Sequence, residues 1–163
     1  MALTEPQPRA LGALSADKYA LPRLPDWHRI IAAVRGETVE PGFVLQLARA
    51  FALLHHTRRI EPRRIAEIDC RRDELIAALD AWVMYICATR STPPPESAGR
   101  AVDAIAAAVV DADHCRLTAT DPIASAVHQD GELSARHANH WTALITQIDA
   151  GQHRRHHESG AVA

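Results

Sequence analysis

The stretch AEIDCRRDELI, from Ala66 to Ile76, decides the fold of this chain. Its apolar residues recur every three or four positions, which is the period of an amphipathic helix. The same period continues to about Thr89, so we expect one long helix that Pro62 opens. Arg72 lies in the middle of its apolar stripe and Asp69 lies just inside the edge. The stretch therefore predicts both a buried helix face and an arginine–aspartate pair on that face.

The rest of the chain repeats the helical pattern. Its 163 residues are 47% hydrophobic and rich in alanine, with no alternating strand pattern and no internal repeat. Asp26 and Gly36 are expected to bound a short helix. Further helices are expected at about 42–58, 97–117 and 122–151. We therefore expect an all-α fold, an antiparallel bundle of four main helices with a short N-terminal helix.

The sequence divides into one domain and two polar ends. We expect a loose N-terminal arm at 1–25, a helical bundle domain at 26–151 and a flexible tail at 152–163. The segment STPPPES at 91–97 cannot be helical and reads as a linker inside the bundle.

Several helices carry charges in line with their apolar stripes. On the second helix, for example, the stripe of Phe43, Leu47, Ala50 and Leu54 continues into Arg58. At about 1.5 Å per residue, the charges fall at similar depths near one pole of an up-down bundle. An unpaired buried charge is costly, so equal numbers of opposite charges predict mutual pairing. The predicted polar layer is Arg58, Asp69, Arg72, Asp113, Arg116 and Asp130.

Three interpretations of this layer remain open. It forms a structural salt-bridge layer, or it lines a pocket for a small molecule or anion, since perturbed charge clusters also mark functional sites. The third interpretation is an exposed end of the bundle with no network, because arginine side chains extend along apolar surfaces toward water.

The segment LIAALDAWVMYICA, Leu75–Ala88, is apolar nearly all round, which indicates burial on more than one side. Trp82 and Tyr85 point away from the core stripe and form a candidate interface. The alternative is that the short N-terminal helix packs there through Trp27. We therefore expect a homo-oligomer or a protein partner. The alternative is a protein that binds a small molecule or anion, or an enzyme, with the arginine–aspartate layer as its site.

Other classes of function find no support in the sequence. No basic stripe indicates nucleic acid, no stretch spans a membrane, and prolines interrupt any signal peptide. Three cysteines without a C-x-x-C pair favour a reducing cytoplasm. Ten histidines include no Glu-x-x-His motif, and neither a nucleophile elbow nor a glycine-rich phosphate loop occurs. We expect a cytoplasmic protein with no metal, cofactor or catalytic residue.

Two segments, LLHHTRR at 53–59 and IAEIDCRRDELIAALDAWV at 65–83, resemble an uncharacterised bacterial family of helical proteins, a domain of unknown function (catalogue number 4254). The matching positions are Leu54, His55, Arg58, Ile68, Asp69 and Arg72. His56 stands where the family has an acid, which argues against an acid-dependent role there. The segment ELSARHANHWTALITQIDAG at 132–151 resembles the last helix of the family. The resemblance spans about two thirds of the chain and implies an all-helical fold but no activity.

Overall fold

The computed structural model describes residues 23–37, 42–86, 96–118 and 135–150. They form α1 (Trp27–Arg35), α2 (Phe43–Ile60), α3 (Ile65–Ile86), α4 (Ala98–Thr118) and a further helical segment at 135–150. These ranges contain no strand, so the all-α prediction is confirmed. None of their helices is long and apolar enough to cross a membrane. Most of the expected arm, the expected start of the last helix and the tail lie outside the described residues.

The ends of α1 follow from the residues that flank it. The Asp26 carboxylate accepts a hydrogen bond from the backbone N–H of Arg29 at 3.1 Å. Gly36 adopts a φ of 74°, and its N–H donates to the Ala33 carbonyl at 3.0 Å. Glycine enters this left-handed conformation at little cost, so Gly36 ends the helix where the sequence indicates.

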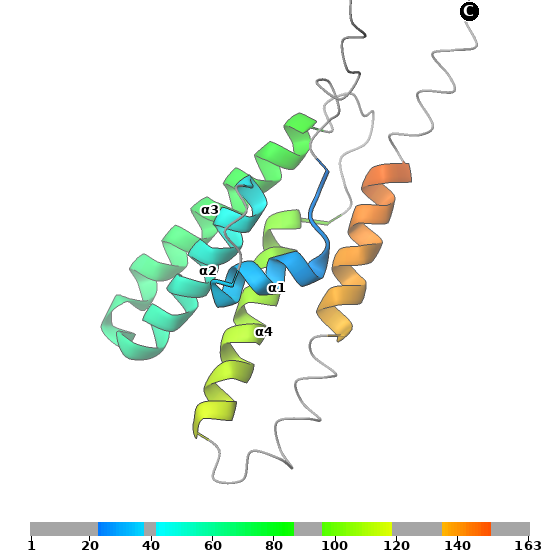
Figure 1. Cartoon of the computed structure of the whole chain (residues 1–163). Coiled ribbons are helices and arrows are strands. Elements are labelled where there is room, and N and C mark those ends of the chain that lie inside the picture. The colour runs from blue at the N-terminus through cyan, green and yellow to red at the C-terminus, as the bar shows by residue number, and fades with distance from the viewer. Residues whose placement is uncertain (1–22, 38–41, 87–95, 119–134, 151–163) are drawn as a thin grey trace, which may run out of the picture.

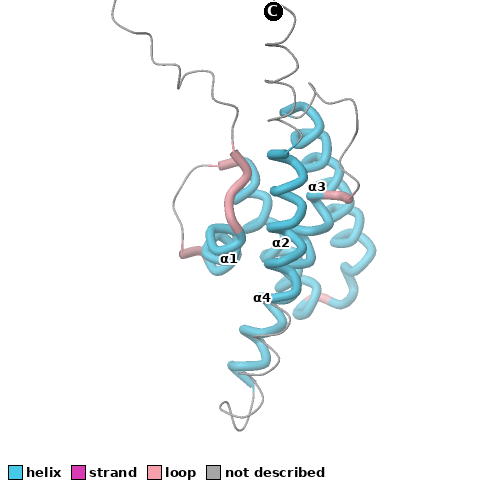
Figure 2. The backbone as a smooth tube through the Cα atoms, turned by 90° about the vertical axis from the view of Figure 1, so that its right-hand side faces the viewer, coloured by secondary structure: helices cyan, strands magenta, loops and turns pink. Residues whose placement is uncertain are grey.

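α2 and α3 lie side by side because only Glu61 and a 3₁₀ turn at Pro62–Arg64 connect them. α4 packs against both, and α1 packs across α2 and α4 (Figures 1 and 2). The segment 135–150 lies on the other side of α4 from α3 (Figure 1). Within the described ranges α1 makes no contact with α3. The alternative in which the short helix covers the outer side of α3 is therefore wrong.

α2 buries a broader surface than its predicted stripe. Phe43 is 39% exposed, and Ala50 and Leu54 are only half-buried. The buried residues of α2 are Val44, Leu45, Leu47, Ala48, Phe51 and Ala52. The difference arises because α2 packs against α1, α3 and α4 together, so its buried arc is set by three neighbours.

α3 and α4 approach most closely at Gly99. A Cβ atom at that position would lie 2.5 Å from the carbonyl oxygen of Ile76, so no larger residue fits. One turn after Ile76, the Asp80 carboxylate accepts hydrogen bonds from the Ser97 hydroxyl at 2.6 Å and the Gly99 N–H at 2.8 Å. A carboxylate at a helix N-terminus is favourable, so these contacts fix the first turn of α4 on α3.

The segment 135–150 joins the core through Trp141, which is fully buried. Its indole N–H donates to the Pro25 carbonyl at 2.8 Å. Leu24 also packs against the core. The last residues of the expected arm therefore belong to the packed part of the molecule.

Candidate functional site

Asp103 of α4 is the centre of a buried polar network and exposes only 7% of its surface. Its Oδ1 accepts hydrogen bonds from His55 Nε2 at 2.8 Å and from Arg72 Nε at 3.1 Å. Its Oδ2 accepts a third from Arg72 Nη2 at 2.5 Å. The His55 nitrogen acts as the donor because an ionised carboxylate only accepts. Helices α2, α3 and α4 thus each contribute one side chain to a single contact.

Arg72 connects this centre to the surface. Its Nη1 donates to Asp69 Oδ1 at 3.0 Å, and Arg58 Nη1 lies 3.1 Å from the same oxygen. All three guanidinium nitrogens of Arg72 are therefore engaged. Side-chain exposure rises from 10% at Asp103 and 20% at Arg72 to 38% at Asp69 and 41% at Arg58. The inner pair is desolvated and the outer pair is solvated, so the inner pair contributes more to stability.

The charges of the inner pair reinforce each other. Burial by itself raises the pKa of the Asp103 carboxyl, but the hydrogen bonds from His55 and Arg72 outweigh it and hold this pKa below its ordinary value. The hydrogen bond to Asp103 raises the pKa of Arg72 in turn. Both side chains are consequently charged at neutral pH. Removal of Arg72 leaves the buried Asp103 carboxylate with the His55 hydrogen bond alone, and removal of Asp103 leaves Arg72 with Asp69 alone.

Asp113 and Arg116 have different neighbours from the rest of the predicted layer. Asp113 Oδ1 pairs with Arg116 and lies 3.3 Å from Arg35 Nη2 at the end of α1. Beside them, Arg59 of α2 pairs with Asp111. The expectation of one shared layer is therefore wrong for the C-terminal part of α4, and Asp130 lies outside the described residues.

The register of α3 on α4 explains this division. Asp80 meets the first turn of α4, so Arg72, two turns earlier on the antiparallel neighbour, meets α4 at Asp103. Asp113 lies about 15 Å further along the axis of α4. The depths read from the sequence assume that the end of α4 lies level with the start of α3. In the structure the end of α4 extends beyond the level of Arg72 and Asp69, so Asp113 does not reach them.

Sequence reasoning misses Asp103 because it lies beside the predicted stripe of α4. In the sequence, the helical period gives α4 an apolar stripe of Val102, Ile105, Ala106 and Val109, and all four residues are buried. However, α4 is buried on further sides, at Ala98, Ala101 and Val110. The usable signal is that no other charge occurs between Arg100 and Asp111. A single charge in a helix that is apolar all round indicates a buried, paired group.

Trp82 and Tyr85 differ in their surroundings. The Trp82 ring is half-buried and packs against Phe43 of α2, with ring centroids 5.5 Å apart. Tyr85 is 80% exposed, and the neighbouring Met84 is 45% exposed. Trp82 therefore belongs partly to the contact between α2 and α3, and Tyr85 lies on an open surface.

Neither a protein-family model, nor a curated protein, nor a solved structure matches this chain. The resemblance to the bacterial family stays a prediction that rests on its motif residues. Four of these, His55, Arg58, Asp69 and Arg72, lie in the network around Asp103.

Proposed function

We propose that this protein functions by binding, as a homodimer that associates through the outer side of the C-terminal half of α3. The observation that carries the proposal is the 80% exposure of the Tyr85 side chain on a helix surface without charge. We call this surface the α3 face. It consists of the exposed residues Ala77, Ala78, Ala81, Met84 and Tyr85.

The absence of charge on the α3 face favours a second copy of the chain as the partner. Between Leu75 and Ile86 the only charged residue is Asp80, whose carboxylate is engaged by α4. In a two-fold dimer the same patch meets itself, so charges near the axis would face like charges. Small apolar residues avoid this repulsion and let two helices pack closely, and contiguous exposed apolar surface marks interaction sites.

Tyr85→Glu tests this proposal more cleanly than a change at Trp82, which would also disturb the contact with Phe43. We expect light scattering to give a dimer mass for the wild type and a monomer mass for Tyr85→Glu, because a desolvated charge is costly. Circular dichroism should show equal helix content in both proteins.

The matched control is Leu117→Glu, which adds the same charge to an 86% exposed residue at the other end of α4. This variant should remain a dimer. A monomeric wild type, or a Tyr85→Glu variant that still dimerises, would contradict the proposal.

The alternative function, binding of a small molecule or anion through the arginine–aspartate layer, has weaker support. Every guanidinium nitrogen of Arg72 already donates to Asp103 or Asp69. We propose that the network around Asp103 serves the stability of the fold.

Two finer expectations are part of the proposal. We propose that α2, α3, α4 and the segment 135–150 are the main helices of an antiparallel bundle, supported by their shared core. We also propose a cytoplasmic location, supported by the free and exposed thiols of Cys70 and Cys115, since reducing compartments keep thiols unpaired.

A further inference from the structure

A polar groove separates the first half of α4 from the start of the segment 135–150. Its volume is about 490 Å³, within the range of small-molecule sites. Ala101 and Ala104 contribute an apolar part of its lining. The polar residues that line it are Glu96, Ser97, Arg100, Arg136, His137 and His140.

The two arginines of the groove have no carboxylate partner among the described residues. Neither the Arg100 nor the Arg136 guanidinium makes a hydrogen bond or ion pair to them. The one acid of the lining, Glu96, pairs with His140 Nε2 at 3.0 Å. Two guanidinium groups therefore line a groove in which the only carboxylate of the described residues is already engaged, and an excess of positive charge results.

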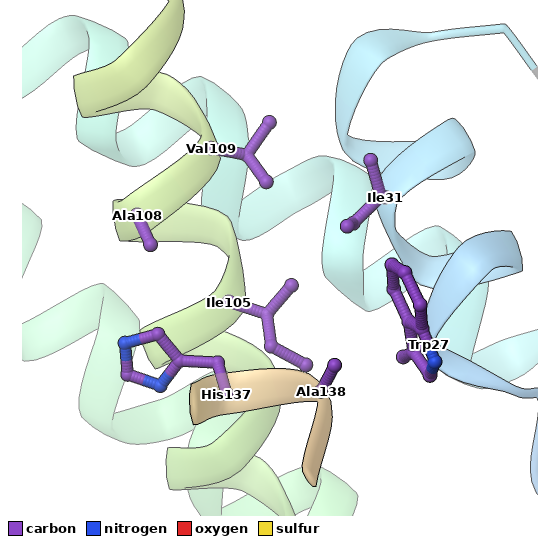
Figure 3. A pocket seen from close by; sticks show the side chains of 7 residues that line it. All are labelled: Trp27, Ile31, Ile105, Ala108, Val109, His137 and Ala138. Carbon is purple, nitrogen blue, oxygen red and sulfur yellow. The ribbon is translucent and has the colours of Figure 1, made fainter. Parts of the chain in front are cut away.

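His137 responds to this excess charge. Burial lowers its pKa, and the positive charges of His140 and Arg136 lower it further. Figure 3 shows the imidazole ring directed away from Trp27, on the α4 side of the segment. The ring thus lies among the groove cations, where an anion would reverse the effect on its pKa.

Three backbone N–H groups at the start of α4 are already engaged. The Gly99 N–H is bound by Asp80, and the Arg100 N–H is bound by the Ser97 hydroxyl. The Ala101 N–H donates to the Ser97 carbonyl. These three N–H groups are not free to hold an anion in the groove, whereas the guanidinium groups match the oxygens of a phosphate with paired donors.

We propose that this groove binds the phosphate group of a small organic phosphate, with Arg100 and Arg136 as the primary ligands and His137 as a third donor. The organic part packs on Ala101 and Ala104. The segment 135–150, which contributes Arg136, His137 and His140 to the groove, lies on the other side of α4 from α3 (Figure 1), so this site is independent of dimerisation through the α3 face.

Calorimetric titration with inorganic phosphate and with phenyl phosphate, at constant ionic strength in chloride, tests the site. We expect one site per chain and tighter binding of phenyl phosphate. Arg100→Met and Arg136→Met should each weaken binding by about tenfold or more, since charge-assisted hydrogen bonds are lost. Equal affinities for the two anions would overturn the organic part of the proposal.

The double variant Arg49→Met/Arg63→Met is the matched control for Arg100→Met/Arg136→Met. It removes the same charge from two exposed arginines outside the groove. Binding should be unchanged in this control. Equal weakening in both double variants would show nonspecific attraction by net charge, and it would overturn the proposal, as would the absence of saturable binding.

Nuclear magnetic resonance of the imidazole protons provides a second readout in the folded wild type. A bound phosphate favours the protonated ring, so the pKa of His137 should rise when phosphate is added. Saturable binding that leaves the pKa of His137 unchanged would place the anion elsewhere and overturn the proposal.

Discussion

The first half of α4 carries two charged residues, Asp103 and Arg100, that differ in their partners. Toward α3, Gly99 permits close approach, and Asp103 receives three hydrogen bonds from His55 and Arg72. On the adjacent face, Arg100 lies beside an open groove and has no carboxylate partner among the described residues. Asp103 and Arg100 are only three residues apart, so the neighbouring helices cause the difference.

The neighbours of α4 both supply basic side chains, but these meet opposite charges on α4. α3 offers Arg72 to the carboxylate of Asp103, and the two side chains are only 20% and 10% exposed. The segment 135–150 offers Arg136, His137 and His140 to Arg100, so cations meet cations. This turn of α4 contributes stability on the side of α3, and we propose that it contributes to phosphate binding on the side of the segment 135–150.

The largest expected effect comes from removing one member of the Arg72–Asp103 pair, on the side of α4 that packs against α3. Arg72→Met leaves the buried Asp103 carboxylate without its arginine partner and with the His55 hydrogen bond alone, which should cost about 3–5 kcal/mol of unfolding free energy. The double variant Arg72→Met/Asp103→Asn should recover part of this loss, because neither charge remains. Urea unfolding followed by fluorescence measures all of these values.

Arg58→Met is the comparison for this cycle. The side chains of Arg58 and Asp69 are 41% and 38% exposed, so the loss of Arg58 should cost at most about 1 kcal/mol. Strictly additive effects of the changes at Arg72 and Asp103 would show that the two side chains do not interact.

A smaller effect is expected from increasing the distance between α3 and α4 at Gly99. Gly99→Ala places a methyl group against the Ile76 backbone and should destabilise the protein by about 1–3 kcal/mol in urea unfolding. Gly42→Ala is the control, since a Cβ there lies 3.7 Å from its nearest neighbour, and it should cost less than about 1 kcal/mol. Equal effects at both glycines would show that α3 and α4 are not in tight contact.

The smallest expected effect on stability comes from His137 in the groove, and it depends on pH. The pKa of His137 is lowered by folding, so the unfolded chain binds this proton more readily. Stability should therefore fall as pH falls below about 6.5, the ordinary pKa of histidine, in phosphate-free buffer. The difference in stability between wild type and His137→Gln, measured from pH 8 to pH 5 (about three units), should shift against the wild type at the acidic end. A constant difference would rule out the lowered pKa.

The sequence predicts the helices well because their ends carry local signals. Asp26 and Gly36 bound α1 through contacts within one turn, and Pro62 opens the turn into α3. Asp69 and Arg72 are found as neighbours because the helical period alone places them together. These predictions need no knowledge of how one helix lies on another.

The parts that the sequence does not predict depend on the register between helices. Asp103 meets Arg72 because Asp80 fixes the start of α4 on α3, a long-range contact with no local signal. The groove depends on which face of α4 the segment 135–150 covers, so Arg100 and Arg136 are ordinary surface arginines in the sequence. The sequence prediction assigns Asp113 to the wrong cluster for the same reason, because Asp113 pairs with Arg35 of α1, a helix that the predicted layer did not include.

The Asp80 carboxylate also couples the local unfolding of α3 to that of α4. It lies within α3, yet it accepts the Gly99 amide proton and the Ser97 hydroxyl proton at the start of α4. Local unfolding of the C-terminal half of α3 would remove the acceptor from both groups at once. Separation of the two helices therefore exposes the Gly99 amide to hydrogen exchange with solvent, and its protection factor reports on that event. The first turn of α4 and the last turns of α3 thus belong to one cooperative unit of unfolding.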